Sequence, residues 1–290
     1  MLPNFLIIGA QKCGTTTLLD YLNPHPQVFM SPSRETQFFI MPNLYSKGLH
    51  QYETQFFSGW NGEKAIGEKT PGYLFVPGTA QRIHQFLGDN IKIVVCLRSP
   101  AERAFSGYRQ NLKLGRECEP FDKAIQLEPE RIAQGAEYAQ TFGYLARGYY
   151  YRQLQEYLTA FPQWKDTFHF IIIDNLVQQQ ETTLKALCTF LDVQYVAPQE
   201  KIASGHAEPK AITVKQSLLG AKTVDWGGTL IQNPSAELLA FVKTYEKTMK
   251  TLAPPSPQEV LDLNDRYFRE DILALQELIG SPLHQWLPPT

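Results

Sequence analysis

The sequence has few cysteines, no long apolar run and almost no net charge, and each absence excludes a class of protein. Its four cysteines, Cys13, Cys96, Cys118 and Cys188, form no CxxC pair and no metal-like spacing, so we expect reduced thiols in a cytoplasmic protein. No segment reaches the roughly 20 apolar residues that span a bilayer, and we see no signal peptide. A net charge of −2 argues against bulk electrostatic binding to nucleic acid or to an anionic membrane.

The composition of the chain is that of a globular protein with a sizeable core. The chain has 290 residues, of which 43% are hydrophobic and 12% aromatic. We find no internal repeat, no low-complexity tract and no break in composition. The sequence therefore predicts a single domain over residues 1–290.

Short apolar runs alternate with amphipathic stretches along the chain. Residues 5–8, 91–97 and 168–173 are typical of buried strands. Helical periodicity is found at residues 16–22, 101–114, 147–161, 180–191, 233–252 and 259–279. This alternation predicts an α/β protein, a three-layer P-loop-like fold with a central parallel sheet flanked by helices. The polar residues 197–228 predict a long loop or mobile segment.

The first candidate binding segment runs from Gly9 to Thr17, between a predicted strand and a predicted helix. Backbone N–H groups and a helix N-terminus would surround an anion there, with threonine hydroxyls and Lys12 as further donors. The segment differs from the nucleoside-triphosphate loop G-x-x-x-x-G-K-[ST], because Thr15 stands where that loop has its lysine. The magnesium-linked phosphoryl-transfer design is therefore not reproduced, and we expect no metal.

A second candidate anchor follows the strand predicted at residues 91–97. Arg98 ends that strand, and Ser106 comes eight residues later, about two turns into the next helix. Parallel sheets place ligands at the carboxyl ends of their strands. A guanidinium and a hydroxyl in these positions could share one phosphate.

The first segment, FLIIGAQKCGTTTLLDYL, resembles the 5′-phosphosulfate loop of the sulfotransferases that use 3′-phosphoadenosine 5′-phosphosulfate (PAPS). The similarity is greatest to the branch that contains the heparan sulfate sulfotransferases. The resemblance implies that Lys12 contacts the sulfuryl-transfer centre. It also implies that the loop binds the cofactor through Gln11, Lys12, Cys13, Gly14, Thr15, Thr16 and Thr17, of which Gly14, Thr15 and Thr16 hold the 5′-phosphate.

Three further segments match motifs of this family in the same order. Arg98 and Ser106 match the pair that binds the 3′-phosphate. Ser33–Phe39, SRETQFF, resembles the segment that carries the general base, which implies that role for Glu35. GEKTPGY resembles the segment that places a lysine near the transferred group, which implies that role for Lys69, whereas Glu68 could be a structural partner.

The resemblance is weaker in the late cofactor-binding segment. The heparan sulfate enzymes have a paired-cysteine loop there, and this chain lacks it. The comparable stretch is 204–215, in which Lys210 or Lys215 is the candidate cofactor ligand.

The sequence as a whole predicts a sulfotransferase that moves a sulfuryl group from PAPS to a hydroxyl or amine of a carbohydrate or other small acceptor. Lys12, Glu35 and Lys69 are the predicted catalytic residues. A hydroxylated acyl chain is an alternative acceptor. Two other classes stay open: a metal-dependent P-loop kinase and a non-catalytic nucleotide-binding module.

Overall fold

The computed structural model describes residues 1–198, 212–216, 222–226, 229–232 and 234–289. The chain forms two compact units. The first comprises residues 1–99, 149–204 and 268–285, and the second comprises residues 100–148, 205–267 and 286–290. Each unit combines separate stretches of the chain, so the division follows no single boundary in the sequence. The single domain expected over 1–290 stays a prediction.

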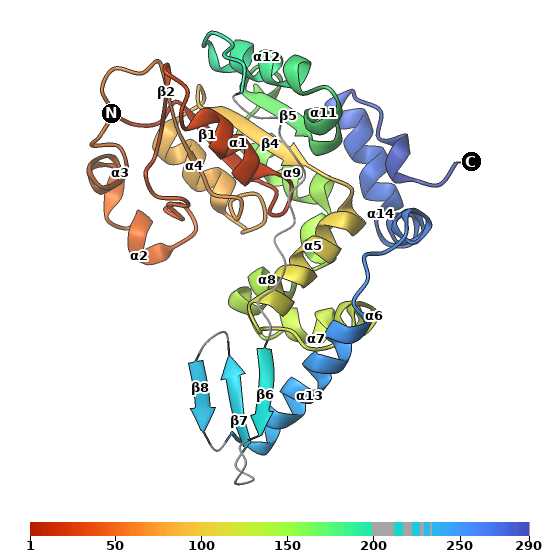
Figure 1. Cartoon of the computed structure of the whole chain (residues 1–290). Coiled ribbons are helices and arrows are strands. Elements are labelled where there is room, and N and C mark those ends of the chain that lie inside the picture. The colour runs from red at the N-terminus through yellow and green to blue at the C-terminus, as the bar shows by residue number, and fades with distance from the viewer. Residues whose placement is uncertain (199–211, 217–221, 227–228, 233, 290) are drawn as a thin grey trace. The chain divides into compact units, whose positions relative to one another are not determined.

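The first unit is built on a five-stranded parallel sheet (Figure 1). The strands lie in the order β2-β3-β1-β4-β5. Their bounds are Phe5–Gly9 for β1, Val28–Met30 for β2, Ala65–Lys69 for β3, Lys92–Leu97 for β4 and Phe168–Ile172 for β5. Every residue of β1 and β3 is buried, as expected for the inner strands of a parallel sheet.

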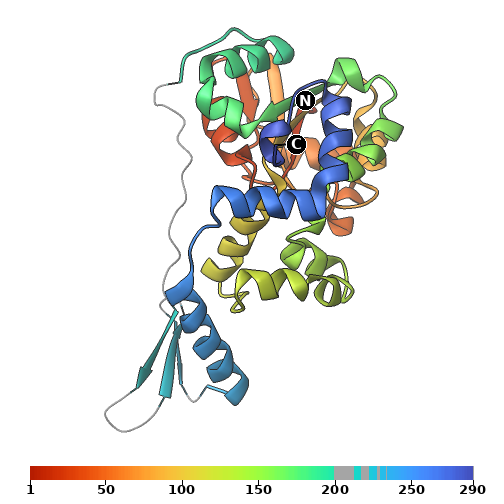
Figure 2. The same cartoon turned by 90° about the vertical axis from the view of Figure 1, so that its right-hand side faces the viewer.

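Helices cover both faces of this sheet (Figures 1 and 2). The chain leaves β1 toward β2 and leaves β3 and β4 in the opposite direction, and right-handed crossovers then place the connecting helices on opposite faces. The helices of the unit that precede β5 are α1 (Thr15–Leu22), α2 (Pro42–Tyr45), α3 (Gly48–Phe56), α4 (Thr79–Leu87), α9 (Tyr150–Ala160) and α10 (Trp164–Thr167). After β5 come α11 (Ile173–Gln178) and α12 (Gln180–Leu191). The predicted three-layer α/β class is confirmed.

An aromatic ring and a glycine fix the spacing at the centre of the sheet. Phe5 of β1 lies opposite Gly67 of β3. A Cβ atom added to Gly67 would lie 2.3 Å from the Phe5 ring, so only glycine fits beneath that ring. Phe38 and Phe39 are both buried and pack edge to face with ring centroids 5.1 Å apart.

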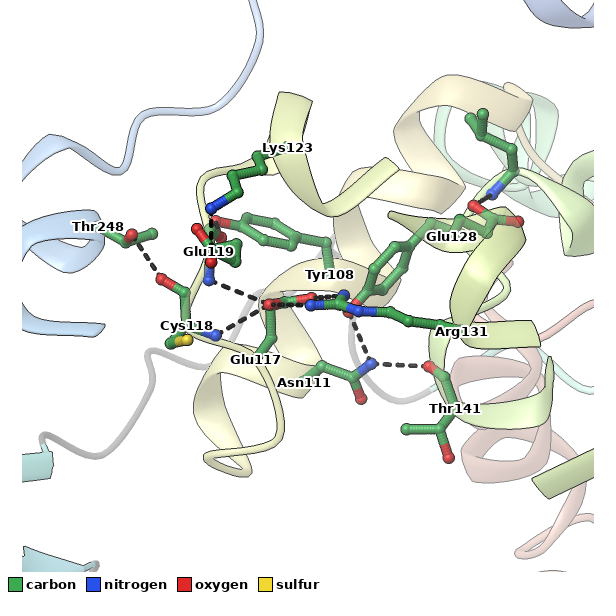
Figure 3. Close-up of polar contacts among 12 residues, drawn as sticks. Tyr108, Asn111, Glu117, Cys118, Glu119, Lys123, Glu128, Arg131, Thr141 and Thr248 are labelled. Atoms are coloured by element: carbon green, nitrogen blue, oxygen red, sulfur yellow. Dashed lines mark hydrogen bonds and ion pairs between the residues drawn. The ribbon is translucent and has the colours of Figure 1, made fainter. Parts of the chain in front are cut away.

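The second unit contains α5 (Pro100–Lys113), α6 (Phe121–Gln126), α7 (Glu128–Ile132), α8 (Ala136–Phe142) and α13 (Ala236–Thr251). A buried carboxylate, Glu117, holds its helical part together (Figure 3). Glu117 accepts hydrogen bonds from both terminal nitrogens of Arg131 and from the backbone N–H groups of Cys118 and Glu119. The hydroxyl of Tyr144 donates a further bond of 3.0 Å to it.

Part of the segment expected to be a long loop is an antiparallel sheet. Strands β6 (Ile212–Gln216), β7 (Lys222–Trp226) and β8 (Thr229–Gln232) pair in that order. Val224 is fully buried and belongs to a hydrophobic cluster with residues of α5 and α13. The loop prediction for 197–228 is therefore wrong at 212–216 and 222–226. The polar composition of this segment gave no signal for these strands.

The remaining boundaries differ little from the predicted ones. The strand expected at 168–173 ends at Ile172, because Ile173 begins α11. The helix expected at 147–161 divides into a 3₁₀ turn, Ala146–Gly148, and α9. The two C-terminal helices are confirmed, and α14 covers Pro257–Ile279. A final 3₁₀ turn covers His284–Trp286.

Candidate active site

The carboxyl edge of the parallel sheet gathers the predicted site segments of the first unit. The chain turns in opposite directions after β1 and β4, so these neighbouring strands form the switch point where α/β sheets bind ligands. Backbone bonds join the strand ends here: Thr70 N donates to Ile7 O at 3.0 Å, and Ala10 N donates to Cys96 O at 2.7 Å. The loop after β1 therefore lies between the end of β3 and the end of β4.

The loop after β1 presents backbone N–H groups at the start of α1. Gly14 is the N-cap residue with φ 78°, and no side chain caps the helix. The first turn contains no acidic residue, so the positive end of the helix dipole is available to an anion. A Cβ atom on Gly14 would lie 2.2 Å from Ile173 Cδ1, so Ile173 would have to move, and the positive φ of Gly14 itself favours glycine. Lys12 also has a positive φ, 71°.

A buried tyrosine joins this loop to the end of β4. The hydroxyl of Tyr150, in α9, lies 3.3 Å from Cys13 Sγ and donates a bond of 3.0 Å to the carbonyl oxygen of Arg98. Both Cys13 and Tyr150 are fully buried. The two predicted phosphate anchors of this unit are thus held by one side chain.

The predicted base and one predicted lysine are in contact. Lys69 Nζ donates to Glu35 Oε1 at 2.9 Å. The Lys69 side chain is only 1% exposed, whereas Glu35 is 39% exposed. Lys69 is the last residue of β3, and Glu35 follows β2, the strand paired with β3. The pairing of β2 with β3 thus brings the two side chains together.

A second carboxylate, Glu68, lies buried beside this pair. It accepts hydrogen bonds from the hydroxyls of Tyr52 at 2.8 Å, Thr70 at 2.7 Å and Tyr73 at 2.7 Å. Burial raises the pKa of the Glu68 carboxyl, and the hydrogen bonds from Tyr73 and Thr70 lower it, with a net rise. Glu68 is a member of a hydroxyl-lined network rather than an isolated buried charge.

The other predicted site residues are placed separately. Thr15 is buried, and Gln11, Thr16 and Thr17 are half-buried, all in the loop after β1 and the first turn of α1. Ser106 is half-buried in α5, which belongs to the second unit. Lys210 lies outside the described residues, and so does the side chain of Lys215.

Two groups at the edge were missed or undervalued by the sequence. Tyr150 lies in the stretch 147–161 that was predicted to be helical, and nothing in its spacing indicated a contact with Cys13. Glu68 did carry a signal, because a carboxylate between apolar strand residues requires hydrogen-bond partners. Within the described part of the chain, no group of three or more histidine, cysteine or acidic side chains is placed to hold a metal ion. None of the described helices is long and apolar enough to cross a membrane.

The fold and this loop define a class of protein. A family model described as the sulfotransferase domain matches residues 2–206, and the chain belongs to that family. The crystal structure of a sulfotransferase from Alicyclobacillus acidocaldarius is similar over 99% of both chains, with a TM-score of 0.71 and 28% sequence identity. The sulfotransferase family that the sequence resembled is thereby confirmed.

Two curated relatives are also similar to this chain. The heparan sulfate glucosamine 3-O-sulfotransferase 5 of Mus musculus is 29% identical over 197 residues, which cover 66% of this chain and 54% of that protein. The membrane-associated sulfotransferase kil1 of Dictyostelium discoideum is 26% identical over 273 residues, covering 67% of this chain and 57% of that protein. The chain thus spans a little over half the length of these relatives.

Proposed function

We propose that the protein transfers a sulfuryl group from PAPS to a hydroxyl or amine of a small acceptor, with Glu35 as the general base. The observation that carries the proposal is the contact between Lys69 Nζ and Glu35 Oε1. It lies at the sheet edge that also bears the loop with the uncapped helix N-terminus. A base, a cation and an anion-binding loop are the groups that sulfuryl transfer needs.

The reaction assigns one task to each group. The acceptor oxygen or nitrogen attacks sulfur in line with the bridging oxygen, and Glu35 takes the acceptor proton as the new bond forms. The bond from sulfur to the bridging phosphate oxygen breaks, and 3′-phosphoadenosine 5′-phosphate leaves. Lys12 and Lys69 offset the negative charge that develops on the sulfuryl and leaving oxygens. The residues of the loop, with Arg98, Ser106 and Lys210, bind the nucleotide.

The relatives favour a carbohydrate acceptor. The mouse relative, 29% identical over 197 residues, is named as a heparan sulfate glucosamine 3-O-sulfotransferase. A hydroxylated acyl chain is the alternative acceptor. Turnover of PAPS with desulfated heparan sulfate, and separately with a 3-hydroxyacyl thioester, distinguishes the two. We also propose a cytoplasmic location from the reduced cysteines, which fractionation of expressing cells would test.

Two substitutions test the assigned roles. Glu35→Gln keeps the shape of the side chain and removes the base, so turnover falls roughly 10²–10⁴-fold while affinity for 3′-phosphoadenosine 5′-phosphate is kept. Lys12→Ala removes a charge that serves both the nucleotide and the transition state, so turnover falls on the order of 10²–10³-fold and affinity falls as well. Turnover, calorimetric affinity and melting temperature are measured for both variants.

The outcomes separate this function from its rivals. A well-folded Glu35→Gln variant that keeps near-full turnover excludes Glu35 as the base. Equal affinity for 3′-phosphoadenosine 5′-phosphate and for 5′-AMP contradicts the 3′-phosphate assignment of Arg98 and Ser106. Tighter binding of ATP with magnesium than of either nucleotide indicates a kinase. Tight cofactor binding without turnover on any acceptor indicates a binding module.

A further inference from the structure

The buried carboxylate of Glu68 is connected to both members of the candidate catalytic pair. Glu68 and Thr70 flank Lys69 in the sequence, and Thr36 follows Glu35 directly. These flanking residues, rather than Lys69 and Glu35 themselves, make the hydrogen bonds of the network. The network therefore acts on the backbone that carries the pair.

Two chains of hydrogen bonds run from Glu68 to the segment that carries Glu35. In the first, the Tyr73 hydroxyl donates to Glu68 Oε1 and lies 2.9 Å from Thr36 Oγ1. Since a hydroxyl has one proton, Thr36 is the donor in the second contact. In the other chain, Thr70 Oγ1 donates to Glu68 Oε2 and accepts a 3.3 Å bond from the backbone N–H of Gln37.

The directions of the bonds to Glu68 fix the order of this network. The hydroxyls of Tyr52, Thr70 and Tyr73 each donate their one proton to Glu68. The hydroxyl oxygens of Tyr73 and Thr70 are then left to accept from Thr36 and Gln37. Replacing the Glu68 carboxylate, or the hydroxyl of Tyr73 or Thr70, removes hydrogen bonds that hold the segment carrying Glu35 in position.

Tyr52 provides an internal comparison for Tyr73. Both side chains are fully buried, and both hydroxyls donate to the same oxygen, Glu68 Oε1, at 2.8 and 2.7 Å. The Tyr73 hydroxyl also contacts Thr36 Oγ1 and the backbone N–H of Phe39. The Tyr52 hydroxyl has Glu68 as its one hydrogen-bond partner among the described residues. The two tyrosines thus differ in their connection to the Glu35 segment.

We propose that Glu68 is a positioning residue, which acts through Tyr73 and Thr70 to hold Glu35 against Lys69 in the geometry that accepts the proton. The inference rests on the proposed function only for its effect on turnover. Its structural content, the separation of Glu35 from Lys69, is independent of any substrate. A general base displaced by about 1 Å loses on the order of 10²-fold in rate.

The test compares Tyr73→Phe with Tyr52→Phe, since each removes one buried hydroxyl from Glu68. Crystal structures of the full chain measure the distance from Lys69 Nζ to Glu35 Oε1, which is 2.9 Å in the unaltered protein. We expect that contact to break in Tyr73→Phe and to persist in Tyr52→Phe. Turnover with PAPS and desulfated heparan sulfate should fall roughly 10- to 10²-fold in the first variant and less than about twofold in the second.

A second pair of variants keeps the test valid if Tyr73→Phe folds poorly. Thr36→Val removes the hydroxyl that donates to Tyr73, and Thr36→Ser retains it. We expect Thr36→Val to lower kcat without changing the affinity for 3′-phosphoadenosine 5′-phosphate, and Thr36→Ser to restore kcat. An intact contact between Glu35 and Lys69 in both Tyr73→Phe and Thr36→Val overturns the inference.

The same measurements separate this inference from the proposed function. If the unaltered protein neither binds 3′-phosphoadenosine 5′-phosphate nor consumes PAPS, the proposed function fails while the distances remain decisive for the positioning role. If the unaltered protein is active and both tyrosine variants lose turnover and melting temperature equally, Glu68 is merely structural and the inference is wrong.

Discussion

Each compact unit contains a buried carboxylate, and the two carboxylates are stabilised in different ways. Glu117, in the second unit, is neutralised by the guanidinium of Arg131 and accepts two backbone N–H bonds (Figure 3). Glu68, in the first unit, receives three hydroxyl bonds and no hydrogen bond from a cation among the described residues. In the Glu117 network a cation neutralises the carboxylate, whereas the Glu68 network supplies only hydrogen bonds from hydroxyls.

The difference indicates what each network is for. An ion pair with two guanidinium bonds is geometrically specific and costly to break, which suits a structural junction. Hydroxyls solvate the Glu68 carboxylate without neutralising it, so burial raises its pKa. The cation next to Glu68 in sequence, Lys69, is left to contact Glu35. The hydroxyl network therefore keeps a buried lysine available to the site.

The largest expected effect is the loss of stability when Glu117, the carboxylate paired with Arg131, is replaced. Glu117→Gln leaves Arg131, whose side chain is 19% exposed, without its partner charge. We expect the free energy of unfolding to fall by about 3 kcal/mol, because breaking a buried ion pair leaves the remaining charge uncompensated. Urea unfolding followed by circular dichroism measures the loss.

The matched control for this prediction is an exposed ion pair in the same region. Lys123 Nζ lies 2.9 Å from Glu119 Oε1, and the Lys123 side chain is 56% exposed. Lys123→Ala should change the free energy of unfolding by less than about 0.5 kcal/mol. Equal effects of Glu117→Gln and Lys123→Ala would show that the buried network is not a stability determinant.

A smaller effect, on pH dependence, is expected for the hydroxyl-solvated carboxylate. The pKa of Glu68 in the folded protein is raised above its ordinary value of 4.5. The folded state therefore holds this proton more tightly than the unfolded chain, and the resulting stability is full below the unfolded pKa and is lost as pH rises through the folded pKa. The unfolding free energy of the unaltered protein minus that of Glu68→Gln should fall as pH increases above about 4.5.

Urea unfolding of both proteins at several pH values from about 4 to 8 measures that difference. Other titrating groups are common to both proteins and largely cancel in it. A difference that rises with pH would mean that the folded protein favours the ionised carboxylate of Glu68, contrary to the raised pKa.

The sequence was most informative for features that depend on residues close together in the chain. Apolar runs located β1, β4 and β5, and the glycines of the first loop located the anion-binding segment. Lys69 and Glu35 were each identified by resemblance, but their contact depends on the pairing of β2 with β3. Both strands escaped prediction: β2 has only three residues, and β3 carries Glu68 and Lys69 at its end.

The network around Glu68 was beyond sequence reasoning for a related reason. Its donors come from α3, from the turn after β3 and from the segment after β2, so they meet only through the fold. The strands at 212–216 and 222–226 were missed because polar residues can form ladders through the backbone alone. Residues far apart in sequence thus complete the site, whereas the second sheet pairs consecutive strands.

The smallest expected effect is that of Ser31→Ala, which is compared with a change at a second buried hydroxyl, that of Thr70. Thr70 Oγ1 donates to Glu68 and accepts from the Gln37 N–H, whereas Ser31 Oγ is buried without a hydrogen-bond partner among the described residues. Removing an unpartnered buried hydroxyl leaves no stranded group behind, so Ser31→Ala should leave the free energy of unfolding unchanged or raise it by up to about 1 kcal/mol. Thr70→Val leaves the Gln37 N–H without its acceptor, so it should lower the free energy of unfolding by about 1–3 kcal/mol. Thermal and urea unfolding of both variants measure the contrast, and a Ser31→Ala loss as large as that of Thr70→Val would mean that the Ser31 hydroxyl is hydrogen-bonded in solution.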